Sequence, residues 1–112
     1  MQLLNPDTVE SFQEFMEAQE LRDFLDRAQQ EMLRSHGLMQ QHFAAQEWAA
    51  LRSVAHRLKG SLGSIGCERL YAQLEQIEQQ LLSTPPEPPS AASMSQLQTL
   101  VTQTAHVLAS IG

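Results

Sequence analysis

A histidine, a lysine and two glycines share one face of an expected helix in the middle of this chain. With about 100° per residue, Lys59, Gly60 and Gly63 lie within roughly 60° of His56, as does Arg52. The opposite face is apolar and carries Leu51, Val54, Leu58, Leu62 and Ile65. A glycine inside a helix costs about 1 kcal/mol relative to alanine, so two of them beside one histidine need a reason. The simplest reason is that they leave room for a bulky partner to reach the imidazole.

The chemistry that suits these residues is attack on phosphorus. Neutral imidazole, the major form of an unperturbed histidine near pH 7, has a free lone pair and is a competent nucleophile. Lys59 lies one turn from His56, is expected to face solvent, and can offset the charge of an added phosphoryl group. Arg52 and Arg57 can add attraction at longer range.

The chain has no features of an autonomous kinase or phosphatase. It contains no G-x-x-x-x-G-K-[ST] loop for a nucleotide and no acidic cluster for Mg²⁺. We therefore expect a phosphoryl carrier without a cofactor of its own, and no enzyme. Its partner would supply the metal ion and most of the transition-state stabilisation.

Other roles for His56 explain less of the pattern. A plain surface histidine leaves the two glycines unexplained. A metal site is disfavoured because no ligand lies at i+4, His36 and His42 diverge on a helix, and His106 is distant in sequence. Cys67 is eleven residues on, roughly 16 Å along a continuous helix, which is too far for a Cys-His nucleophilic pair.

Length and composition predict one α-helical domain spanning residues 1–112. Apolar residues make up 42% of the chain, whereas glycine and proline number only five each and aromatic residues are sparse. The net charge of −6 argues against nucleic acid or an anionic membrane as the main partner. No apolar run approaches the roughly 20 residues that span a bilayer, and the N-terminus does not resemble a signal peptide. The single cysteine excludes an internal disulfide and fits the reducing cytoplasm.

The helical pattern predicts a short N-terminal helix with Asp7 as its cap, followed by a long one. Gly37 interrupts the long pattern and allows a kink or break there. The helix that carries His56 is expected over about 47–65, with Gly66 in the left-handed conformation that ends it.

A fourth amphipathic pattern follows, with Leu70, Leu74, Ile77 and Leu81 at helical spacing. A proline-rich connector over 83–93 precedes a last helix that starts at about Ser95. Four long amphipathic helices pack most simply as a bundle. We therefore predict an all-α fold: an antiparallel four-helix bundle with a short extra N-terminal helix.

The segment His56-Arg57-Leu58-Lys59-Gly60-Ser61, followed by Gly63, Gly66 and Leu70, resembles the H-x-L-K-G-S signature of histidine-containing phosphotransfer (HPt) domains. The flanking segments 46–51 and 74–75 are also similar, so the resemblance covers roughly residues 46–78.

This resemblance implies a four-helix bundle that relays phosphoryl groups between receiver-domain aspartates in two-component phosphorelays. It implies that His56 is the phosphorylated residue, Lys59 its electrostatic neighbour and Gly60 the clearance position. In such domains a polar residue on a neighbouring helix often hydrogen-bonds the ring, and Gln40 and Gln41 are the candidates here.

One departure from the family pattern is Cys67, where the family more often has a small residue such as alanine. We expect this cysteine to act as a small buried apolar residue. The proline-rich connector is a second departure, and it is expected to be a spacer.

The implied partners are response-regulator receiver domains and hybrid sensor histidine kinases. The side chains around the histidine are expected to contact them, namely Arg52, Ser53, Arg57, Gly63 and Ser64. A chain that starts at Met1 and ends after an expected helix at Ile111-Gly112 favours a free-standing protein, and an acidic bundle with one apolar stripe on each helix favours a monomer. The cytoplasm is the expected location. The main alternative is a helical adaptor that docks on a receiver domain or histidine kinase without being phosphorylated.

Overall fold

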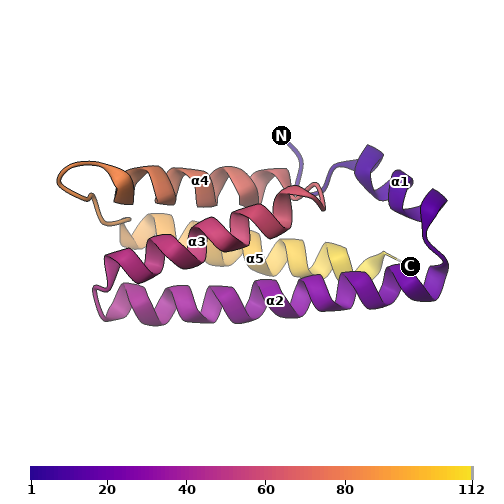
Figure 1. The fold of residues 1–112 in the computed structure, drawn as a ribbon, viewed down its shortest axis with the longest axis horizontal. Coiled ribbons are helices and arrows are strands. Elements are labelled where there is room, and N and C mark those ends of the chain that lie inside the picture. The colour runs from indigo at the N-terminus through magenta and orange to yellow at the C-terminus, as the bar shows by residue number, and fades with distance from the viewer. Residues whose placement is uncertain (112) are drawn as a thin grey trace.

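In the computed structural model, which describes residues 1–111, the chain folds into five α-helices. They are α1 (Pro6–Phe15), α2 (Ala18–Ala44), α3 (Trp48–Gly63), α4 (Glu68–Leu82) and α5 (Ala91–Ser110). Helices α2 to α5 run antiparallel in sequence order and close into a bundle, and α1 lies at the end where α2 begins (Figure 1). The predicted all-α bundle with an extra N-terminal helix is confirmed. Gly112, at the expected C-terminal end, lies outside the described residues.

The core of the bundle forms between all four long helices. Helix α3 packs between α2 and α4, and α5 closes the other side against the same two helices. The five apolar residues predicted for the inner face of the His56 helix are all buried. Among the large apolar side chains of α1 and α2, Phe15 and Leu33 are exposed. No helix within residues 1–111 is long and apolar enough to cross a membrane.

Helix α1 begins two residues earlier than a cap at Asp7 would require. The side chain of Asn5 accepts hydrogen bonds from the backbone N–H groups of Asp7, at 2.9 Å, and Thr8, at 3.4 Å. Pro6 occupies the first turn, where its fixed φ and missing N–H are tolerated. The prediction that Asp7 caps the helix is therefore wrong, and Asn5 is the cap.

Helix α5 also begins earlier than predicted, at Ala91 instead of about Ser95. Ser90 is the cap, and its Oγ accepts a hydrogen bond from the backbone N–H of Ser93 at 3.0 Å. Pro89 directly precedes this cap and is buried. The connector between α4 and α5 is thus shorter than the predicted 83–93.

Helix α2 runs through Gly37 without interruption, so the break that the sequence allowed there is absent. Buried residues on both sides, including Met32, His36 and Met39, hold this helix against the bundle. Tertiary packing therefore outweighs the cost of about 1 kcal/mol that one glycine imposes on a helix.

Replacing Gly37 by alanine should stabilise the protein. A Cβ atom at this position has nothing within 4 Å, and the backbone is already helical. We expect Gly37→Ala to raise the free energy of unfolding by about 0.5–1 kcal/mol, through helix propensity and a less flexible unfolded chain. Urea unfolding followed by circular dichroism measures this change. A loss of stability would contradict the conclusion that a Cβ atom at position 37 meets no other atom.

The turn between α3 and α4 is fixed by the N-terminal segment. Gly66 has a φ of 85°, the left-handed conformation predicted for it. Its carbonyl accepts a hydrogen bond from the backbone N–H of Asn5 at 2.8 Å, and a Cβ on Gly66 would lie 3.0 Å from the side chain of Thr8. The segment before α1 is therefore packed directly on the turn that ends the His56 helix.

His36 makes the stability of the bundle sensitive to acid. Its side chain is buried in α2, its Nε2 has no hydrogen-bond partner within residues 1–111, and burial lowers its pKa below the ordinary 6.5. A neutral His36 therefore stabilises the fold above its unfolded-state pKa, and this contribution is lost as the pH falls through the folded-state pKa.

We accordingly expect the free energy of unfolding to fall more between about pH 7.5 and about pH 5 in the wild-type chain than in a His36→Leu variant. Urea unfolding of both proteins at the two pH values measures the difference. Equal losses in the two proteins would mean that the burial of His36 does not contribute to the pH dependence of the free energy of unfolding.

Candidate functional site

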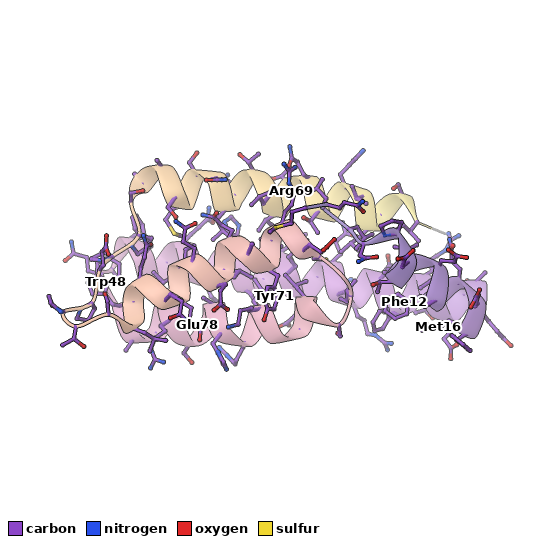
Figure 2. All side chains as sticks on the ribbon, turned by 90° about the horizontal axis from the view of Figure 1, so that it is seen from above. Phe12, Met16, Trp48, Arg69, Tyr71 and Glu78 are labelled. Carbon is purple, nitrogen blue, oxygen red and sulfur yellow. The ribbon has the colours of Figure 1, made fainter. Side chains whose placement is uncertain are left out.

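Helix α4 presents a stripe of three side chains to His56, Lys59 and Gly63 of α3. Residues four and seven positions apart share a face of a helix, and α3 and α4 are antiparallel, so equally spaced residues on the two helices meet in pairs. Figure 2 shows Tyr71 and Glu78 along the side of α4 that faces α3. The three pairs are His56 with Glu78, Lys59 with Glu75, and Gly63 with Tyr71.

His56 is exposed but held at one nitrogen. Its side chain is 64% exposed, whereas that of Glu78 is only 7% exposed, and His56 Nδ1 lies 2.7 Å from Glu78 Oε1. An ionised carboxylate can only accept a hydrogen bond, so Nδ1 carries the proton of this bond. The neutral ring then has its lone pair on Nε2, the nitrogen that Glu78 does not contact.

Lys59 is also paired, contrary to the expectation that it faces solvent. Its Nζ lies 2.6 Å from Glu75 Oε2 and 2.8 Å from Glu78 Oε2, and its side chain is only 14% exposed. The Nζ also lies 5.7 Å from the centre of the Tyr71 ring, on its face. These contacts raise the pKa of Lys59, first through the hydrogen bond to Glu75 and then through the one to Glu78.

Both glutamates are held in their ionised form. The hydrogen bond from Lys59 is the main cause that lowers the pKa of Glu75. For Glu78, burial alone would raise the pKa, but hydrogen bonds from Lys59 and His56 outweigh it and bring the pKa below its ordinary value. Glu78 is therefore a carboxylate that joins the histidine to the lysine.

The two glycines of the motif have different surroundings. A Cβ on Gly60 would have nothing within 4 Å, so this position is open, as an access role requires. A Cβ on Gly63 would lie 3.3 Å from Cε2 of Tyr71. Gly63 thus makes room for the Tyr71 ring, a role different from the partner access predicted for it.

The side chains expected to contact a partner surround His56 on α3. Ser53, Arg57 and Ser64 are exposed, and Arg52 is half-buried. Ser64 Oγ donates a hydrogen bond to the carbonyl of Ser61 at 3.0 Å. Ser53 and Arg57 therefore lie within one turn of His56, whereas Ser64 is the C-cap residue of α3, eight residues beyond the histidine.

The residue that bonds the imidazole lies on a different helix from the one expected. Gln40 and Gln41, the candidates on α2, are exposed, and the bond to the ring comes from Glu78 on α4. The spacing of Tyr71, Glu75 and Glu78 is the reverse of that of His56, Lys59 and Gly63, as an antiparallel neighbour requires, and this was the available signal. The spacing alone does not say which residue of α4 meets which residue of α3, because this depends on the register of the two helices.

Neither a metal site nor a reactive thiol accompanies this network. Within residues 1–111 there is no group of three or more His, Cys, Asp or Glu side chains that could hold a metal ion. Cys67 is buried, and burial raises its pKa to about 11, which disfavours the reactive thiolate. The expectation that Cys67 is a small buried residue is confirmed.

Comparison with known proteins identifies the family. No curated protein and no solved structure matches the chain. The family model for the Hpt domain, however, matches residues 10–107, nearly the whole chain. Hpt domains are phosphocarriers and are not catalysts. The chain therefore belongs to the Hpt domain family and takes part in histidine phosphotransfer of two-component signalling.

Proposed function

We propose that this chain accepts a phosphoryl group on His56 from a receiver-domain aspartate and passes it to another receiver in a phosphorelay. The observation that carries this proposal is the 2.7 Å bond between Nδ1 of an exposed His56 and the buried Glu78. It leaves the Nε2 lone pair of the neutral ring free for the reaction.

In the forward step, Nε2 of His56 attacks the phosphorus of the aspartyl phosphate. The N–P bond forms while the P–O bond to the aspartate breaks, and the aspartate leaves as a carboxylate with the electron pair. The ring becomes a phosphoimidazolium whose Nδ1–H still points at the Glu78 carboxylate. Glu78 thereby stabilises the positive charge that develops on the ring, and the reverse sequence returns the phosphoryl group to a receiver.

The roles of Lys59 and Gly60 follow from their contacts. Because Lys59 lies between two carboxylates, we assign it the task of keeping Glu78 ionised and oriented toward His56. Gly60 leaves open space one turn from the ring, where a partner must approach. Arg52, Ser53, Arg57 and Ser64 are proposed to contact that partner.

The proposed setting is that of a single-domain monomer in the cytoplasm, where receiver domains and hybrid sensor histidine kinases are its partners. The net charge of −6 and the single buried cysteine support this setting. The chain is proposed to act as a carrier and to depend on its partners for any nucleotide or metal chemistry.

Transfer of label from a receiver domain tests the proposal. A panel of receiver domains is loaded with ³²P on the aspartate, mixed with the purified chain and separated by electrophoresis. We expect label on the chain that is lost in acid and stable in base, as for a phosphohistidine. The adaptor alternative predicts that a receiver binds the chain but that no receiver in the panel labels it.

Glu78 provides a residue-level test of the mechanism. Replacing it by leucine leaves Nδ1 without an acceptor and Lys59 with one carboxylate, so labelling of His56 by phosphoramidate should slow by about tenfold or more. Glu78→Gln retains an oxygen that can accept from Nδ1 and should restore part of the rate. Equal rates in the wild-type chain and in Glu78→Leu would mean that the bond to the ring has no role in transfer.

A further inference from the structure

A groove lies next to the candidate site, at the end of α3 where Tyr71 packs on Gly63. Its volume is about 470 Å³, and its lining combines small and apolar residues, Gly63, Cys67, Tyr71 and Ala72, with the charged Glu68. Gly63 is two helical turns from His56 on the same face of α3, about 10 Å along the helix axis. The groove therefore opens on the face from which His56 projects.

Exposed apolar side chains lie on both sides of the histidine on this face. Leu82 follows Glu78 by one turn on the same face of α4 and is 49% exposed, and Tyr71 lies two turns before Glu78. Within residues 1–111 five large apolar or aromatic residues are exposed, and three of them, Met1, Tyr71 and Leu82, lie at the groove or on this face. Tyr71 and Leu82 thus place exposed apolar side chains on both sides of the His56–Glu78 pair along α4.

A protein interface of ordinary size that is centred on His56 covers both the groove and Leu82. A stable interface covers about 800 Å² of each protein, which corresponds to a patch of roughly 16 Å radius. A receiver whose aspartate reaches Nε2 of His56 must therefore cover the groove in one direction and Leu82 in the other. Clustered apolar residues at the centre of such a patch supply most of the binding energy.

We propose that the groove and Leu82 together form a docking surface for a receiver domain, called here the α3–α4 docking surface. Apolar side chains next to the receiver's phosphorylatable aspartate fill the groove beside Tyr71 and pack on Leu82. This inference rests on the proposed function and adds to it the face of the bundle that the partner covers. None of the side chains listed above as expected partner contacts belongs to α4, so the inference adds a second helix to the interface.

Charged substitutions on this surface test the proposal. The variants are Leu82→Glu and Ala72→Glu, and the control is Leu33→Glu. Leu33 is 48% exposed, almost the same as Leu82, and it lies on α2, two turns before Gln40, which lines a groove against α5. For each protein, the rate constant of labelling by the most efficient receiver is divided by the rate constant with phosphoramidate, a donor too small to need docking.

We expect this ratio to fall about tenfold in Leu82→Glu and Ala72→Glu and to stay at the wild-type value in Leu33→Glu. If Ala72→Glu does not fold, as judged by circular dichroism, Leu82→Glu alone decides, since its side chain is already exposed. An unchanged ratio in Leu82→Glu would overturn the docking surface while the phosphocarrier function stands. Absence of label from both donors on the wild-type chain would overturn the two together.

Discussion

Replacing His56 by glutamine is expected to abolish labelling of this chain by both a phosphorylated receiver domain and phosphoramidate. The glutamine amide has no basic lone pair that can attack phosphorus, so no N–P bond forms. Its side-chain N–H can still donate to Glu78, and the position is exposed, so helix content should be unchanged. The expected result is a complete loss of acid-labile label with a folded protein.

The matched control for this variant is His106→Gln. His106 is also exposed and helical, but it lies on α5, away from the pairs between α3 and α4. Electrophoresis after incubation with ³²P-loaded receiver should show full label on this control. Acid-labile label that persists on His56→Gln would place the phosphoryl group on another residue and remove the basis of the proposed function.

Replacing Gly60 by glutamine is expected to have the second-largest effect. The added side chain has open space in the free protein, so the fold should tolerate it. It projects one turn from His56, however, where a receiver must approach to within bonding distance. A displacement of about 1 Å at a reacting centre can slow a reaction by about a hundredfold, so we expect transfer from the receiver to slow by about tenfold to a hundredfold.

Gly37→Gln is the control for this steric effect. Gly37 is also a helical glycine with nothing within 4 Å of an added Cβ, but it lies on α2. Both variants add the same side chain to an open helical glycine, so their effects on stability should be similar. Receiver transfer that is equally fast in Gly60→Gln and in Gly37→Gln would show that the space at Gly60 is not needed for access.

The fold was predictable where local chemistry decides it. Burial of the apolar face of α3 follows from the helical period, which depends only on spacing along the chain. The left-handed conformation at Gly66 was predicted for the same local reason. The cap of α1 was missed although its signal is also local: Asn5 and Asp7 are both good capping residues, but Pro6 favours the first helical position and so makes Asn5 the cap.

Gly37 shows the limit of local propensity. A glycine lowers the stability of a helix by an amount that does not depend on its partners, and this allowed a break in α2. The helix remains continuous because buried residues on both sides of Gly37 pack on the rest of the bundle. That packing energy depends on contacts with the other helices. The spacing of residues within α2 gives no information about these contacts.

The sequence by itself singled out the residue that is proposed to carry the chemistry. His56 has glycines beside it, a cation one turn away and an apolar face behind it, and all of these features lie within one helix. The tertiary structure decided the state of the site. Which of several glutamates on α4 meets the imidazole depends on the register between α3 and α4, which the turn at Gly66 and the packing of the core establish.

That register pairs Glu78 with His56 and places Lys59 between two carboxylates instead of in solvent. It thereby selects the ring tautomer with the proton on Nδ1 and holds both glutamates ionised. It also seats Tyr71 in the space left by Gly63. These properties depend on distances between atoms of two helices, and such distances exist only once the bundle has formed.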